Sequence, residues 1–308
     1  MSLRRLAVTA LALGLALLPE RLAAQTLLYV SNQGNGTVST VNISTGAVVN
    51  ASFIAGLSGP FQMALDNNGN LYVTNYYLGT VGKYNASTGA AINASFLSGL
   101  ANPFGVAVDA SGNLFVALSG GGAIGVFNST TGTAINTSFI TGLSSPYGIS
   151  LDGLGGLYIA NNGGGTIGKY NASTGAAIAA ALISVSSPYQ VFADGLGSVY
   201  VATPNTNTVG LYNAATGAPI NASLVTGFQQ ALGMAVDYQG NLFVAGYGTN
   251  TIGKFDATTG AVINTSFATG LSNPYSLVFM PVPEPSTLAL TGAGAALLVC
   301  LRRRRIAG

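Results

Sequence analysis

Residues 71–113 read LYVTNYYLGTVGKYNASTGAAINASFLSGLANPFGVAVDASGN, and residues 114–156 repeat the pattern as LFVALSGGGAIGVFNSTTGTAINTSFITGLSSPYGISLDGLGG. One aromatic position marks this period along the chain, with steps of 43, 43, 43, 42 and 43 residues: Tyr29, Tyr72, Phe115, Tyr158, Tyr200 and Phe243. A period of this length is typical of one propeller blade of four strands. The repeat therefore indicates a ring of blades.

Each repeat contains four short runs of β-branched and aromatic residues, separated by Gly, Asn, Ser and Thr. In one unit the strands are expected at 104–109, 114–118, 123–128 and 134–140. The first two runs are apolar on both faces, as in a sheet packed between neighbouring sheets. We predict an all-β, six-bladed β-propeller of four-stranded blades over residues 25–281.

The first recognisable strand of the chain does not correspond to the first strand of a repeat. The first recognisable strand, Leu27–Ser31, is a second strand of the repeat, and the last is a first strand. First strands are expected six times, at 61–66, 104–109, 147–152, 189–194, 232–237 and 275–280. Residues 27–57 and 275–280 are therefore predicted to share the closing blade, which leaves no unpaired terminal sheet.

The N-terminus has the order of a secretory signal peptide. Arg4 and Arg5 precede the uncharged apolar run 6–18, and the small residues Ala23 and Ala24 follow. We expect residues 1–24 to be removed by cleavage. An uncleaved anchor is the alternative, because the bulky Leu22 precedes Ala23 and Ala24.

The C-terminus combines a short apolar run with a basic end. Residues 288–301 carry no charge, but 14 residues of helix span only about 21 Å, less than a hydrocarbon core of about 30 Å. Four arginines follow, as expected at the cytoplasmic end of a membrane segment. By length alone this short hydrophobic helix would be a weak transmembrane anchor.

This tail, residues 282–308, resembles the PEP-CTERM sorting signal in the order of its motif, apolar run and basic cluster. The residues that carry the resemblance are Pro283, Glu284, Pro285, Arg302, Arg303, Arg304 and Arg305. It implies a Gram-negative bacterium, an inner-membrane intermediate, cleavage by an exosortase near the motif, and a final place at the cell surface or in the extracellular matrix. Such proteins accompany exopolysaccharide and biofilm production. A plain C-terminal anchor is the alternative.

Two phrases of the repeat, PFGVAVD (103–109) and GNLFV (112–116), resemble NHL-repeat propellers. The resemblance implies the propeller fold. Those repeats commonly carry an Asp and an Arg after the second strand, where this chain has neutral Asn and Gly, as in NNGGGTIGKY (161–170). The departure argues against a charged docking surface.

Few charged residues lie between the two tails, and their scarcity excludes several functions. The predicted domain has three lysines and six aspartates, net −3, with no His, Glu, Arg or Cys. Nucleic acid is excluded as a partner because no basic patch exists. Propeller lactonases and lyases rely on acidic metal ligands or His, so no enzyme, metal or cofactor is expected. The single cysteine, Cys300, lies in the tail, so the domain has no disulfide.

Three sets of polar residues recur with the repeat. Five aspartates are interpreted as turn residues, with a Ca²⁺-binding ring as the alternative: Asp66, Asp109, Asp152, Asp194 and Asp237. Three lysines, which we expect to keep an outer strand soluble, follow a glycine: Lys83, Lys169 and Lys254. Ten Asn-x-Ser/Thr triplets, as in NASTGA (85–90), are interpreted as turns, although glycosylation stays open.

The loops after second strands and those before first strands are expected on one rim, which is neutral and rich in Asn and Tyr. Pro-aromatic pairs such as Pro60-Phe61 and Pro103-Phe104 belong to it. The candidate ligand-binding residues are Asn75, Tyr76, Tyr77, Asn161, Asn162, Asn205, Asn207 and Tyr247. Amides and aromatic faces suit a neutral polysaccharide. The expected function is an exported, non-catalytic binding module for exopolysaccharide or a surface protein; a biofilm-matrix scaffold, or less readily a lactonase-like enzyme, is the alternative.

Overall fold

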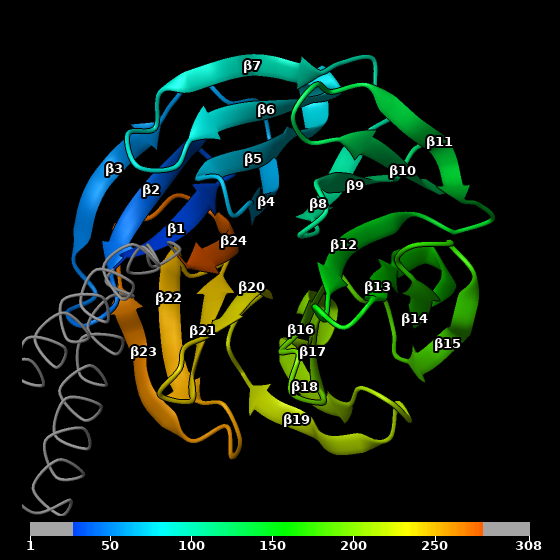
Figure 1. Ribbon diagram of the computed structural model, residues 1–308. Coiled ribbons are helices and arrows are strands. Elements are labelled where there is room, and N and C mark those ends of the chain that lie inside the picture. The colour runs from blue at the N-terminus through cyan, green and yellow to red at the C-terminus, as the bar shows by residue number, and fades with distance from the viewer. Residues whose placement is uncertain (1–26, 280–308) are drawn as a thin grey trace, which may run out of the picture. The chain divides into compact units, whose positions relative to one another are not determined.

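A computed structural model describes residues 27–279, so the predicted signal peptide and sorting signal lie outside the described residues. Within them, 24 strands form six four-stranded antiparallel sheets. The sheets are arranged as blades around a central axis (Figure 1). The predicted six-bladed all-β propeller is confirmed.

In the first complete blade the strands run from the axis outward as β4 (Pro60–Leu65), β5 (Asn70–Asn75), β6 (Thr80–Asn85) and β7 (Ala91–Leu97). The next four blades repeat this order: β8 (Pro103–Val108), β9 (Asn113–Leu118), β10 (Ala123–Asn128), β11 (Ala134–Ile140); β12 (Pro146–Leu151), β13 (Gly156–Asn161), β14 (Thr166–Asn171), β15 (Ala177–Ser184); β16 (Gln190–Ala193), β17 (Ser198–Thr203), β18 (Thr208–Asn213), β19 (Pro219–Thr226); β20 (Ala231–Val236), β21 (Asn241–Gly246), β22 (Thr251–Asp256), β23 (Val262–Ala268). Five of the six first strands begin and end one residue earlier than expected, and β16 is shortened to 190–193.

The closing blade joins the two ends of the described chain. Its order is β24 (Pro274–Phe279), β1 (Leu27–Asn32), β2 (Thr37–Asn42) and β3 (Val48–Ile54). Tyr29 lies opposite Val278, and the Ser276 backbone N–H donates to the Ser31 hydroxyl at 2.9 Å. The shared blade predicted from the phase of the repeat is confirmed.

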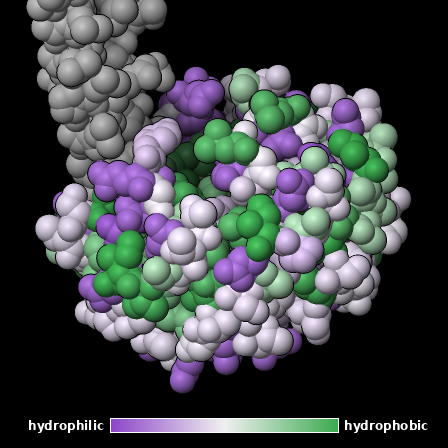
Figure 2. All heavy atoms as spheres, turned by 90° about the horizontal axis from the view of Figure 1, so that it is seen from below, coloured by the Kyte–Doolittle hydropathy of each residue, from purple (hydrophilic) through white to green (hydrophobic). Residues whose placement is uncertain are grey.

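Apolar side chains of adjacent blades pack face to face and form the core. Phe115 and Ile124 of one blade contact Ile149 and Leu157 of the next, and all four side chains are fully buried. Outside the core, the edge of the ring near β19 and β23 mixes apolar and polar side chains (Figure 2). The propeller is therefore held by burial between blades, about 1.5–3 kcal/mol for each large apolar side chain.

In four of the six blades, the aromatic residue that marks the repeat also bonds the blade to the following one. Four tyrosine hydroxyls donate to a backbone carbonyl in the third-to-fourth-strand turn of the next blade: Tyr29 to Ala86, Tyr72 to Ser129 (2.7 Å), Tyr158 to Ala214 (3.0 Å) and Tyr200 to Ala257 (3.1 Å). Phe115 and Phe243 occupy the same place without a hydroxyl. We refer to these four bonds as the tyrosine latches.

The structure contradicts the prediction that the repeated lysines solubilise an outer strand. Lys83 is 8% exposed, and its Nζ donates to the Ser129 carbonyl at 2.9 Å while lying 5.1 Å from the ring centre of Phe96. Lys169 bonds the Ala214 carbonyl at 3.3 Å in the same way. A long aliphatic stem with a charged tip suits this place, because the stem packs between blades and the ammonium finds a carbonyl and aromatic faces.

The repeated aspartates and part of the Asn-x-Ser/Thr triplets form turns. Asp66 Oδ1 accepts bonds from the backbone N–H of Asn68 at 2.9 Å and of Asn70 at 2.8 Å. Asn85 Oδ1 accepts the N–H groups of Ser87 and Thr88, both at 3.0 Å. Both motifs satisfy the backbone of a tight reversal, which confirms the turn interpretation for them. It is wrong for the triplets that lie inside fourth strands, at Asn50, Asn93, Asn136, Asn221 and Asn264.

The tyrosine latches predict a loss of stability at alkaline pH. Burial raises the pKa of both Tyr29 and Tyr200 from 10.0 to about 12. Between pH 10 and 12 the unfolded chain therefore releases these protons before the folded chain does, so stability present below pH 10 falls as the pH rises. A shift of two pKa units corresponds to at most about 2.7 kcal/mol per tyrosine.

The measurement is the urea midpoint of the purified propeller at pH 9 and pH 11. The double variant Tyr29→Phe/Tyr200→Phe is expected to be less stable at pH 9, because two hydrogen bonds are lost, and to show a smaller fall between the two pH values. An equal fall in wild type and variant would show that these phenols do not titrate as inferred.

Candidate functional site

The loops that join second to third strands and fourth to first strands meet on one face, as predicted. We call this face the loop rim. The Tyr76 N–H donates to the Gly59 carbonyl at 3.1 Å, which ties the β5–β6 loop to the β3–β4 loop. Short 3₁₀ turns shape three of these loops: η1 (Tyr76–Leu78), η2 (Asn162–Gly164) and η3 (Pro204–Thr206). Among residues 27–279, no helix is long and apolar enough to cross a membrane.

An aromatic ring surrounds the propeller axis at the loop rim. It consists of the second residue of four first strands, the residue just before β16, and one leucine: Phe61, Phe104, Tyr147, Tyr189, Leu232 and Tyr275. Phe104 stacks on Tyr147 with ring centres 4.0 Å apart and on Phe61 at 4.5 Å. Tyr275 meets Phe61 edge to face at 4.6 Å. The stacked rings form a rigid apolar floor.

Loop residues raise a wall around this floor and enclose a cavity of about 360 Å³, which we call the aromatic cup. Tyr247 Oη donates to Gln33 Oε1 at 3.0 Å, and Gln33 Nε2 donates to Tyr77 Oη at 3.1 Å. This chain of bonds connects the loops of three blades. Gln230, Pro204 and Asn205 complete the wall. The wall is thus polar and the floor aromatic.

Half of the predicted ligand-binding residues lie in the cup. These are Tyr76, Tyr77, Asn205 and Tyr247. Tyr77 is the most accessible of the aromatic residues that line the cup, at 64% exposure. Tyr76 packs edge to face on Phe61 with ring centres 5.0 Å apart, so it belongs to both wall and floor.

The other four predicted asparagines do not line the cup, because their side chains hold the loops together. Asn75 is 3% exposed, and its Oδ1 accepts the Ser58 N–H. Asn161 Oδ1 accepts the Ser144 N–H at 2.7 Å, and Asn207 Oδ1 accepts the Gln230 N–H at 2.7 Å. Asn162 Nδ2 donates to the Pro188 carbonyl at 3.2 Å. The structure therefore does not bring these four together with the cup residues.

The floor residues were not among the residues predicted to bind a ligand, although a recurring sequence pattern pointed to them. The recurring Pro-aromatic pair placed them on the rim, and only the structure brings them together at the axis. Gln33 and Gln230 stand outside the repeated pattern and carried no such signal.

The cup is electrically neutral. None of the residues that line it carries a charge. Burial, together with the neighbouring phenols of Tyr189 and Tyr147, holds the pKa of Tyr275 well above its ordinary value. Tyr275 is 3% exposed, and its hydroxyl has no hydrogen-bond partner within residues 27–279. The Tyr275 hydroxyl can therefore still donate and accept a hydrogen bond beside the cup.

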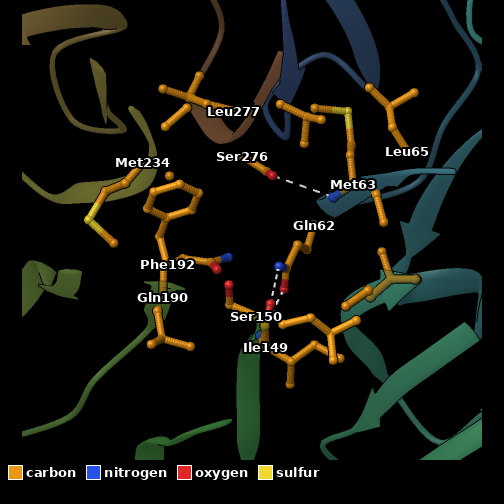
Figure 3. A pocket seen from close by; sticks show the side chains of 18 of the residues that line it. Gln62, Met63, Leu65, Ile149, Ser150, Gln190, Phe192, Met234, Ser276 and Leu277 are labelled. Carbon is orange, nitrogen blue, oxygen red and sulfur yellow. Dashed lines mark hydrogen bonds between the residues drawn. The ribbon is translucent and has the colours of Figure 1, made fainter. Parts of the chain in front are cut away.

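A second cavity of about 310 Å³ is lined by the first strands further along the axis, and its polar lining residues include Gln62, Ser150, Gln190 and Ser276 (Figure 3). Gln62 crosses the axis and makes two bonds to Ile149, with Nε2 donating to its carbonyl at 2.7 Å and Oε1 accepting its N–H at 3.1 Å. Gly105 allows this approach, because a Cβ there would lie 3.0 Å from Gln62 Oε1 and 3.1 Å from the Ile149 nitrogen. Met63, Ile149, Met234 and Leu277 make the walls mainly apolar.

Neither cavity is lined by Asp, Glu, His, Lys, Arg or Cys among the described residues. The cup offers aromatic faces, phenol hydroxyls and side-chain amides. These groups bind hydroxyl-rich neutral molecules by stacking and by hydrogen bonds in both directions.

The chain carries a recognised sorting signal, and its propeller has structural neighbours. Residues 281–305 match the PEP-CTERM protein-sorting motif. The motif implies that the protein is exported and is first anchored in the membrane. An exosortase then processes it, and it reaches the cell surface of a Gram-negative bacterium.

Two solved structures share the fold. A chain of the crystal structure of a nidogen/laminin complex aligns with a TM-score of 0.68 at 16% identity, covering 84% of this chain and 99% of that one. A protein of unknown function from Bacteroides caccae aligns with a TM-score of 0.63 at 16% identity, covering 82% and 98%. Curated proteins give no match. At these identities the likeness establishes the fold alone, and the NHL resemblance stays a prediction.

Proposed function

We propose that this surface-sorted propeller is a non-catalytic module that binds a neutral exopolysaccharide in the aromatic cup. The observation that carries the proposal is the cup itself, a neutral cavity with an aromatic floor and an amide-and-phenol wall. Sugar rings present apolar C–H faces that pack on aromatic rings, and their hydroxyls pair with amides. The sorting motif supports this reading, because it directs the chain to the surface where such polymers lie.

Non-catalytic binding is favoured by the side chains present. Acid–base catalysis needs a group that exchanges protons near neutral pH, and the phenols of Tyr147, Tyr247 and Tyr275 are moved away from that range because burial raises their pKa values. The polar groups that face the cup are suited to hold a ligand in place.

Replacing Tyr76, Tyr77 and Tyr247 by Ala in one variant is expected to lower the affinity for the host's own exopolysaccharide by at least about tenfold. Each lost stacking contact is worth on the order of 1 kcal/mol, and the Gln33 bonds to Tyr77 and Tyr247 are also removed. Affinity electrophoresis and calorimetry measure the change, and thermal unfolding checks the fold. Because the cup is neutral, wild-type binding should vary little between low and high salt.

Tyr238→Ala is the matched control, since Tyr238 is 79% exposed and lies in a first-to-second-strand turn, away from the rim. It should bind as wild type does. Equal binding by the triple variant, or no binding of exopolysaccharide or of any arrayed neutral glycan by the wild type, would reject the cup as a glycan site and favour a scaffold.

A further inference from the structure

The face opposite the loop rim carries the first-to-second-strand turns and the third-to-fourth-strand turns. We call it the turn face. Backbone bonds join the two kinds of turn, as from the Ala172 N–H to the Gly155 carbonyl at 2.9 Å and from the Ala86 N–H to the Gly69 carbonyl at 2.9 Å. Every first strand ends here. The innermost strand of the closing blade, β24, does so at Phe279, so the chain leaves the propeller from the turn face.

Three consecutive blades place a large apolar side chain at the tip of such a turn. Leu154 is 81% exposed, Leu196 91% and Tyr238 79%. Turn geometry does not require them, because Asn68 and Ser111 occupy the position of Leu154 and Leu196 in other blades. The Leu154 N–H bonds Asp152 Oδ1 at 2.8 Å just as the Ser111 N–H bonds Asp109 Oδ1 at 2.9 Å. These side chains leave their apolar surface to solvent, on the same face of three consecutive blades.

The sequence beyond Phe279 limits how far the turn face can be from a bilayer while the chain is membrane-anchored. Eight residues, 280–287, separate Phe279 from the apolar run that starts at Leu288. Even fully extended, such a connection reaches only about 30 Å. Phe279, at the end of β24, can therefore lie no further than about 30 Å from Leu288.

We infer that the turn face of the membrane-anchored form lies on the lipid surface, with Leu154, Leu196 and Tyr238 inserted into the interfacial layer. Leucine adds apolar contact, and tyrosine suits the interface because its ring is apolar and its hydroxyl polar. The carboxylates of this face do not protrude from it. All six aspartates of the propeller are buried or half-buried and accept turn N–H bonds, and Asp152 also pairs with Lys169 at 3.6 Å.

The arrangement has two consequences. The aromatic cup points away from the membrane, because it lies on the opposite face. Three side chains alone bind a bilayer weakly, so they hold the propeller there only while the tail keeps their local concentration high. Removal of the tail should then release the domain from the lipid.

A tryptophan reporter tests the inference directly, because the chain contains no Trp. Full-length chain would be reconstituted in phosphatidylethanolamine/phosphatidylglycerol vesicles that contain brominated lipid. Leu196→Trp is expected to emit at shorter wavelength and to be quenched about twofold or more, as for an interfacial residue. Tyr77→Trp, in the cup wall on the opposite face, should remain unquenched.

A second reporter removes the contribution of tryptophan's own affinity for lipid. Ser173→Trp, at an exposed position of the turn face, is measured in the natural background and together with Leu154→Asn, Leu196→Asn and Tyr238→Asn. Its quenching should fall to the level of Tyr77→Trp when the three apolar tips are removed. Equal quenching of the reporters on the two faces, or quenching of Ser173→Trp that the three substitutions leave unchanged, would overturn the inference. Circular dichroism melting confirms that each variant is folded.

Discussion

A chain that ends before Pro274 is expected to lose the cooperative unfolding transition of the propeller. Strand β24 is the only strand of the closing blade supplied by the C-terminal side of the ring, and it forms the inner edge of that blade. Without it, the core residues Leu28 and Val30 of β1 lose Leu277 as a packing partner. The aromatic floor loses Tyr275 at the same time.

The size of the effect follows from what β24 buries. Tyr275 and Leu277 are 3% and 5% exposed, and each such side chain contributes about 1.5–3 kcal/mol when buried. With the ladder to β1 and the partly buried Val278 and Phe279, the loss is on the order of 5–10 kcal/mol, which equals most of the stability of an ordinary domain.

Differential scanning calorimetry of two truncated chains measures the effect. A chain of residues 25–280 keeps β24 and should unfold in one sharp transition. A chain of residues 25–273 should show none. If the shorter chain melted cooperatively within a few degrees of the longer one, five blades would be able to close without β24, and the closing blade would not be the element that secures the ring.

The fold could be predicted because a single sequence repeat determines both the number of blades and the way in which the ring closes. The 43-residue step fixed the number of blades, and the phase, from a second strand at Leu27 to a first strand at Tyr275, fixed the closure. Asp66 and Asn85 were assigned correctly for a related reason. Turn residues act on backbone groups two to four positions away, so sequence alone contains both partners.

The placement of the site residues could be predicted only in part, because their contacts join single residues that are 23 to 46 positions apart in the sequence. Asn207 looks like a free rim amide until Gln230, 23 residues later, is seen to donate to it. Lys83 looks like a surface residue until Ser129 of the next blade is found beside its Nζ. Tyr77 and Tyr247 depart from the repeat, and the structure places both in the cup wall; their role in binding stays a prediction.

The second large effect concerns the sorting signal, which lies outside the described residues. Replacing Glu284 by Ala is expected to leave the C-terminal tail attached in a host that has an exosortase. In a peptide of this sequence, Pro283 and Pro285 restrict the backbone on both sides of Glu284 and favour an extended form that presents its carboxylate. Alanine keeps the backbone preference and removes the charge, so the variant isolates recognition of the carboxylate by the protease.

Intact-mass spectrometry of the native protein gives the answer, since wild type should lack the residues beyond the motif and Glu284→Ala should retain them to Gly308. Thr287→Ala, just outside the motif, is the matched control and should be cut as wild type is. The cut lies beyond Phe279, so all 24 strands stay in the released protein, and its melting temperature should equal that of the uncut variant. Wild-type protein that still ends at Gly308 in the exosortase-positive host, or a Glu284→Ala variant cut as fully as the control, would contradict the role assigned to this glutamate.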